Sequence, residues 1–120
     1  HPGNAMYRPA EPGSGDNRPH CVLIDLALVH AGHWIEDAVY LERQYWGRPD
    51  LLHGIKPVSL LAKLRRERGM TIEGDYGHLA AVRRVLMASI QPLFLDREGY
   101  AKHLHASLEA IEHALPMVGH

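Results

Sequence analysis

The sequence contains a single cysteine, Cys21, in a chain of 120 residues. One thiol can form neither an internal disulfide nor a thiolate metal site, and this scarcity is typical of proteins from the reducing cytoplasm. No apolar run approaches the roughly 18 residues that a membrane-spanning helix needs. The N-terminus also lacks the basic and apolar pattern of a signal peptide. We therefore expect a cytoplasmic protein that does not insert into a membrane.

Excess charge of one sign is also missing, because 13 Lys and Arg residues face 14 Asp and Glu residues. This balance argues against general binding to nucleic acid or to membrane surfaces. The charges are unevenly placed, however: residues 51–70 carry five cations and one acid, and residues 21–50 carry two cations and five acids. Segments of opposite charge can face each other within one fold, or they can attract a second copy.

Residues 1–20 are rich in proline and glycine, with four of the eight prolines of the chain, and they show no hydrophobic period. Such a composition does not bury enough apolar surface to fix a conformation. We therefore predict a flexible, disordered N-terminal arm over residues 1–20 and a folded domain over residues 21–116.

The spacing of apolar residues predicts that the first helix covers residues 21–46 and ends at Gly47. Residues 22–29 would also suit a short buried strand, but their leucines and alanines favour a helix. The apolar face of this helix is wider than about 100°, more than one neighbouring helix would cover. We therefore expect it at the centre of a bundle or at the seam of a homodimer.

A second helix is predicted over residues 57–68, with Pro57 in its first turn and Gly69 after its end. The third begins near Asp75 and the fourth runs from Asp96 to Pro116. The large side chains expected to face the core from these last two helices are Leu79, Val82, Leu86, Ile90, Leu104, Leu108, Ile111 and Leu115. The sequence thus predicts an all-α, four-helix bundle-like single domain.

Aromatic residues are scarce, at 7% of the chain, and four of them gather in the second half of the first predicted helix: Trp34, Tyr40, Tyr45 and Trp46. Aromatic side chains at a helix end suit an interface as well as the rim of an ordinary core. Our main hypothesis is a non-enzymatic interaction or regulatory module. It would form a homodimer, bind an unidentified protein partner through these aromatics, and need no cofactor.

A second hypothesis is a metal-binding or enzymatic bundle. His30, His33 and Asp37 are spaced for one face of the first helix, and His105 and Glu109 for one face of the last. Imidazole and carboxylate groups from two helices suit a transition metal such as zinc, iron or manganese. The Glu-x-x-His motif of di-metal helical bundles, however, does not occur in the predicted helices.

A third hypothesis is a nucleic-acid-binding regulator that uses Lys63, Arg65, Arg66, Arg83 and Arg84. The second and third helices could form a helix-turn-helix unit, whose second helix enters a DNA groove. The cations lie mainly on the first of these two helices, which argues against that geometry.

Arg97 and His103, with five residues between them, are similar to the Arg-x(4–6)-His motif of helical RNases of the HEPN class. The resemblance covers only this seven-residue segment, and Glu98 follows the arginine. It implies a helical enzyme in which Arg97 binds a phosphate and His103 acts as a general acid or base.

Overall fold

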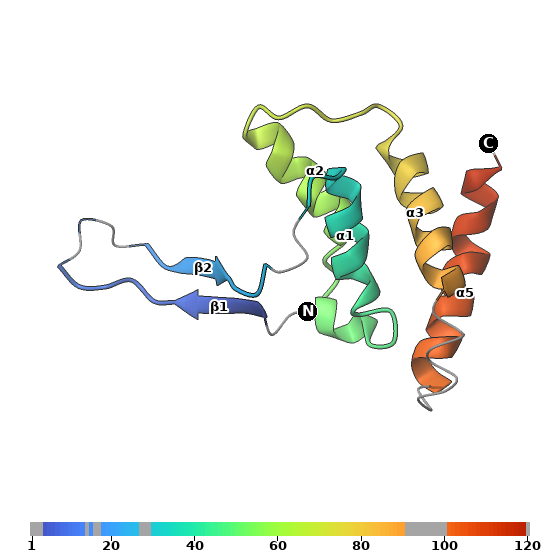
Figure 1. Cartoon of the computed structure of the whole chain (residues 1–120), viewed down its shortest axis with the longest axis horizontal. Coiled ribbons are helices and arrows are strands. Elements are labelled where there is room, and N and C mark those ends of the chain that lie inside the picture. Colours follow the sequence, from blue (N-terminus) through green and yellow to red (C-terminus); the bar gives the residue numbers. More distant parts are fainter. Residues whose placement is uncertain (1–3, 14, 16–17, 27–29, 91–100, 120) are drawn as a thin grey trace. The chain divides into compact units, whose positions relative to one another are not determined.

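The structure, a computed structural model, divides the chain into two compact units, His1–Ala31 and Gly32–His120, described separately below (Figure 1). The residues that it describes are 4–13, 15, 18–26, 30–90 and 101–119.

The first unit contains a two-stranded antiparallel hairpin. Strand β1 (Ala5–Arg8) pairs with strand β2 (His20–Leu23), and Tyr7 lies opposite Cys21. Two sequence predictions are therefore wrong: the arm contains a strand, and the chain after residue 20 begins as a strand rather than a helix. The reason is tertiary, because the Val and Leu side chains of β2 favour an extended chain once a second strand supplies the ladder hydrogen bonds.

Helix α1 covers Trp34–Arg43, ten residues of the predicted 21–46. It begins at Trp34 because the imidazole Nδ1 of His33 accepts a hydrogen bond from the backbone N–H of Ile35, at 3.2 Å. Glu36 and Asp37 then lie in the first turn, where the helix dipole favours negative charge. The prediction of one long helix with a wide apolar face is thus wrong, since residues 21–26 and 30–33 are not helical.

A short 3-10 helix, η2 (Pro49–Leu52), links α1 to α2 (Pro57–Glu67). The prediction for α2 is confirmed within one residue at its end, with Pro57 in the first turn. Gly69 has a φ of +69°, and the backbone N–H of Met70 donates to the carbonyl of Arg65 at 2.9 Å. Glycine adopts this left-handed conformation without the steric cost that a Cβ would bring, and the turn ends the helix as the sequence predicts.

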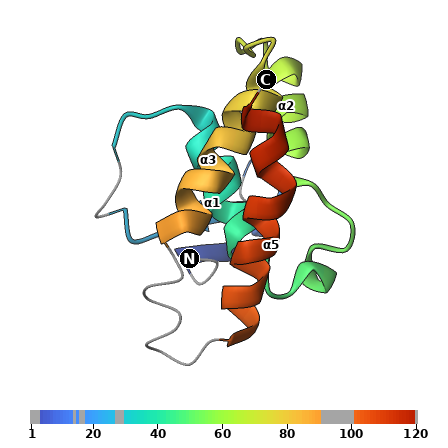
Figure 2. The ribbon, with the colours of Figure 1, turned by 90° about the vertical axis from the view of Figure 1, so that its right-hand side faces the viewer.

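Helices α3 (Tyr76–Ile90) and α5 (Ala101–Val118) lie side by side and run antiparallel (Figures 1 and 2). Where the start of α3 meets the end of α5, Nδ1 of His78 lies 3.0 Å from the carbonyl oxygen of Met117. The third predicted helix is confirmed, and the start of the fourth at Asp96 lies outside the described residues. Pro116 does not end α5, because a proline in the last turn removes only one backbone hydrogen bond there.

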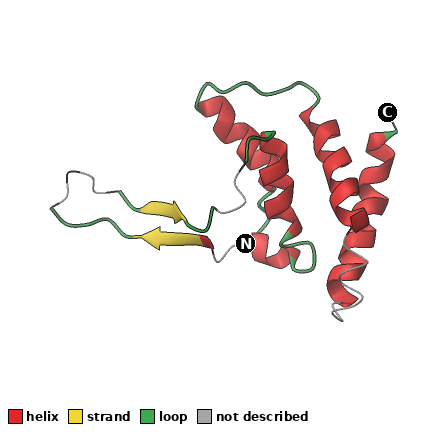
Figure 3. Ribbon diagram, in the orientation of Figure 1, coloured by secondary structure: helices red, strands yellow, loops and turns green. Residues whose placement is uncertain are grey.

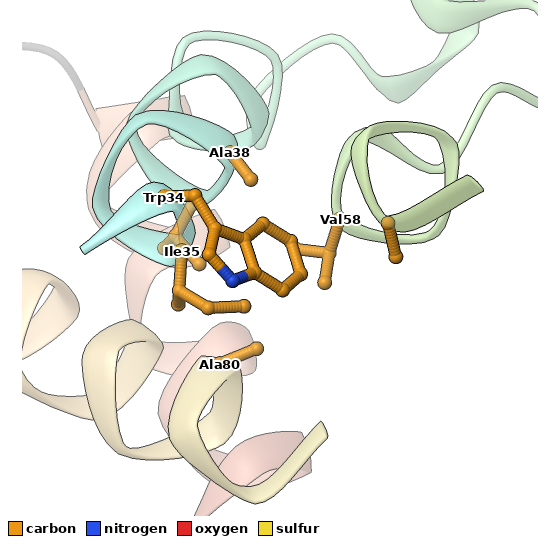
Figure 4. Close-up of a cluster of buried hydrophobic side chains, with 7 residues drawn as sticks. Trp34, Ile35, Ala38, Val58 and Ala80 are labelled. Atoms are coloured by element: carbon orange, nitrogen blue, oxygen red, sulfur yellow. The ribbon is translucent and has the colours of Figure 1, made fainter. Parts of the chain in front are cut away.

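The core forms where α1 packs against α2 and α3 (Figure 3). The indole of Trp34 lies between the two neighbouring helices, with Val58 of α2 on one side and Ala80 of α3 on another (Figure 4). Ile35 and Val39 complete the buried face of α1. None of the described helices is long and apolar enough to cross a membrane.

Small side chains fill the buried faces of α3 and α5. The buried residues of these two helices are Ala80, Ala81, Ala88, Ala106, Ser107 and Ala114. Leu86, Leu108 and Leu115, which we expected to face the core, are each at least 50% exposed. That expectation is wrong because alanine faces let two helices approach closely, which turns the large side chains outward. The fold is mostly helical with a small two-stranded sheet, rather than all-α.

Candidate functional site

Trp34, the first of the four aromatics proposed for an interface, is only 8% exposed. Its indole N–H donates to Oε2 of Glu73 at 2.9 Å. The guanidinium of Arg65 lies 5.4 Å from its ring centroid and the ring of Tyr76 lies 5.7 Å away. Trp34 therefore serves the core of its own chain, where it joins α1, α2 and the loop before α3.

Glu73 connects this loop to the start of α1. Besides Trp34 it meets Nε2 of His33, which lies 3.2 Å from Oε1 of Glu73. Nδ1 of His33 is already the acceptor for Ile35, so Nε2 is the atom that faces this carboxylate, and Nε2 and Oε1 do not have hydrogen-bond geometry. The pKa of Glu73 is lowered, chiefly because the Trp34 N–H donates to its carboxylate, with a smaller contribution from its own backbone N–H.

A lowered pKa makes this carboxylate a source of stability at neutral pH. The stabilisation is present above the ordinary glutamate pKa of about 4.3 and is lost as pH falls through the lowered value. We expect Glu73→Gln to lower the melting temperature at pH 7 and to have no effect at pH 2. Thermal unfolding followed by circular dichroism at both pH values tests this, with exposed Glu11→Gln as the control. An equal loss at both pH values would contradict it.

Glu42 and Arg84 form a bidentate ion pair in the helical unit. Nε and Nη2 of Arg84 donate to the two carboxylate oxygens of Glu42 at 2.7 and 2.9 Å, and the two side chains are only 24% and 18% exposed. The indole N–H of Trp46 also donates to Glu42, at 3.3 Å. This bidentate pair fixes α3 against the end of α1 and positions Trp46.

Two grooves open on the helical unit. The larger, of about 810 Å³, is bounded by the end of α1, the start of α2 and the faces of α3 and α5. Tyr45 and Trp46 line it, next to the Glu42–Arg84 pair. Glu42, Arg84 and Trp46 satisfy one another there, and Lys56, Glu109 and His113 also line this groove.

The smaller groove, of about 490 Å³, lies between α1, η2 and α2. Five of its lining side chains are aliphatic and between 41% and 51% exposed: Leu41, Leu51, Ile55, Leu60 and Leu64. Apart from Asp37 and His53, the described lining residues carry no charge. We call this surface the leucine groove. Tyr45, in the turn after α1, also lines it, and Tyr40 is exposed on α1.

Sequence reasoning found only Tyr45 of the leucine groove as an interface residue. Leu51 and Ile55 fall in a connector without a helical period, so nothing marked them as surface. Leu60 is placed on the flank of α2 by the helical period, which was the one available signal. The groove arises because α1 ends early and the chain turns back through η2, with His53 and Gly54 both in left-handed conformations.

The structure does not gather the proposed metal ligands. Among the described residues, no three His, Cys, Asp or Glu side chains are placed to share a metal ion. His33 caps α1 and contacts Glu73, while Asp37 lines the leucine groove. His105 and Glu109 do meet, at 3.3 Å on the exposed side of α5. His30 belongs to the first unit.

The five proposed nucleic-acid cations are each engaged within the chain. Arg84 binds Glu42, and Arg83 lies 3.6 Å from Glu36. On α2, the guanidiniums of Arg65 and Arg66 lie over the rings of Trp34 and Tyr76, and Lys63 lies 3.8 Å from Glu67. On α2, Arg65 and Arg66 thus contact aromatic rings of their own chain, and Lys63 belongs to a solvent-exposed face of the helix.

The distance between Arg97 and His103, the HEPN-like pair, is not described, because Arg97 lies outside the described residues. His103 packs directly on the turn after α1: a Cβ added at Gly47 would lie 2.7 Å from its Nδ1. A larger residue at position 47 would therefore displace the imidazole of His103, which packs closely on this glycine.

No known protein family, curated protein or solved structure matches this chain. The described residues form a mostly helical unit with a largely aliphatic groove between α1, η2 and α2.

Proposed function

We propose that this protein is a non-enzymatic interaction module that binds an amphipathic helix of a partner protein in the leucine groove. The single observation that carries the proposal is the set of five half-exposed aliphatic side chains around a concave surface of about 490 Å³. Contiguous exposed apolar surface with a polar rim marks protein interaction sites. A groove between two helices is the usual receptor for the apolar face of a third helix.

Charge on the rim adds a second requirement for the partner. Asp37 lines the groove and has no ion-pair partner among the described residues. A basic side chain beside the apolar face of the partner helix would satisfy this carboxylate at the rim, where charge governs specificity more than affinity. The partner helix should thus carry apolar residues at positions i, i+3, i+4 and i+7, with a Lys or Arg flanking them.

Site-specific photocrosslinking tests the proposal. A photoreactive amino acid at Leu60, introduced into the full chain in its native cells, is expected to give a covalent adduct. The same label at Met70, an equally exposed apolar residue outside both grooves, is the matched control and should give none. Mass spectrometry then identifies the crosslinked peptide, which should have the amphipathic pattern above.

A synthetic copy of that peptide allows a quantitative measurement. We expect Leu41→Asp, on the opposite wall of the groove, to weaken its binding by at least about tenfold in a fluorescence titration. The absence of any adduct at residue 60, or undiminished peptide binding by Leu41→Asp, would reject the proposal.

A further inference from the structure

Helix α5 carries a seam of four large apolar side chains, of which two are exposed and two are half-buried in the described structure. Leu104, Leu108, Ile111 and Leu115 follow one another at intervals of four, three and four residues. This is the a/d spacing of a coiled coil. Leu108 and Leu115 are 50% and 53% exposed, whereas the opposite side of α5 is buried through Ala106 and Ala114.

The neighbouring helix extends this surface rather than covering it. The contact between His78 and Met117 sets the antiparallel register of α3 and α5, which places Leu86 of α3 about level with Leu108. Leu86 is 53% exposed. Figure 2 shows α3 and α5 in front of α1, as the outer layer of the helical unit. This layer has the form of one half of a four-helix bundle.

From this pattern we infer that the seam of α5 is covered by α5 of a second copy of the chain, antiparallel to the first. In that arrangement Leu104 packs opposite Leu115 of the second copy, and Leu108 opposite Ile111 of the second copy. We call each of these pairs a layer. The two-fold axis generates a second copy of each layer, so all four seam residues of each chain pack in the interface. Helix α3 of each copy flanks the seam.

Charge on the open edge of the seam selects the second copy as the occupant. His105 and Glu112 occupy equivalent positions, each one residue after a seam residue and both on the edge away from α3. The antiparallel register sets His105 and Glu112 of the second copy between the same two layers of the seam, offset by about 3 Å along the helix axis. The basic half of one α5 thus meets the acidic half of the other, at both ends of the seam. In the single chain His105 lies 3.3 Å from Glu109.

Mass measurement of the full chain tests the dimer. Light scattering after gel filtration should give twice the mass of the chain. We expect Leu108→Glu to weaken dimerisation by at least about a hundredfold, because each dimer loses two seam leucines and gains two charges. Met70→Glu, at an exposed apolar residue outside the seam and both grooves, is the control and should leave the dimer intact. Unchanged circular dichroism of both variants shows that they fold.

Disulfide trapping tests the orientation, in a chain whose exposed Cys21 is replaced by serine. His105→Cys and Glu112→Cys combined should give a covalent dimer under mild oxidation, and each change alone should not. Residues seven apart on one helix are separated by about 10.5 Å, too far for a disulfide within one chain. A monomeric mass for the unchanged chain, or a disulfide dimer from either single variant, would overturn the inference. Neither outcome bears on the leucine groove, which is tested at other residues.

Discussion

Replacing Trp34 with alanine is expected to lower the free energy of unfolding by about 3–5 kcal/mol, the range for a buried tryptophan. The side chain is 8% exposed and lies among residues of all three helices of the core. It also donates its indole N–H to Glu73. A small domain has only about 5–15 kcal/mol of stability in total, so this variant should unfold at much lower denaturant.

The measurement is urea unfolding followed by far-ultraviolet circular dichroism, at one fixed protein concentration because the proposed dimerisation would contribute to stability. Trp34→Phe keeps most of the packing but loses the hydrogen bond, so we expect a smaller loss of about 1–2 kcal/mol. Tyr40→Ala, on the exposed side of the same helix, is the control and should change stability by less than about 1 kcal/mol. Similar losses for Trp34→Ala and Tyr40→Ala would show that Trp34 is not a core residue.

The second large effect is expected at Arg84. Arg84→Ala removes the bidentate partner of Glu42 and leaves a carboxylate that is mostly shielded from water. Breaking one partner of such a pair costs about 2–4 kcal/mol, because the remaining charge is desolvated without compensation. The indole of Trp46, which shares this carboxylate, should become more mobile, giving a change in tryptophan fluorescence.

Arg83 provides a matched control on the same helix. It lies 3.6 Å from Glu36, and these side chains are 38% and 35% exposed, so Arg83→Ala should cost less than about 1 kcal/mol. The double variant Glu42→Gln with Arg84→Met should recover part of the stability lost in Arg84→Ala, because no unpaired charge remains. Equal losses at Arg83 and Arg84, in the same urea experiment, would contradict the structural role of the Glu42 pair.

Local sequence signals predicted the ends of a helix correctly where a proline or glycine marks them. Pro57 and Gly69 bound α2 because one fits a first helical turn and the other a left-handed turn. They failed at α1, where the cap is the imidazole of His33 rather than one of the usual small polar residues. The periodicity of residues 21–46 was real, but strand pairing with Ala5–Arg8 competed for its first part.

The candidate sites were predicted unevenly for a related reason. Sequence patterns give the type and spacing of side chains, and they picked out Tyr45 as an interface candidate and the apolar row of α5 as core-facing. They weighted large apolar residues as core, whereas α3 and α5 bury alanines and turn leucines outward. The leucine groove could not be anticipated, because its walls come from α1, a 3-10 turn and α2, which meet only after the chain reverses.

The sequence by itself determined a mostly helical protein, the bounds of α2 and most of α3, and the near balance of charge. These properties depend on residues close together in the chain. The tertiary structure alone decided that residues 20–23 pair as a strand, that Trp34 is core, and that Leu60 and Leu108 face outward. Those outcomes depend on which surfaces meet, because burial is set by partners distant in the sequence rather than by the apolar character of the residue itself.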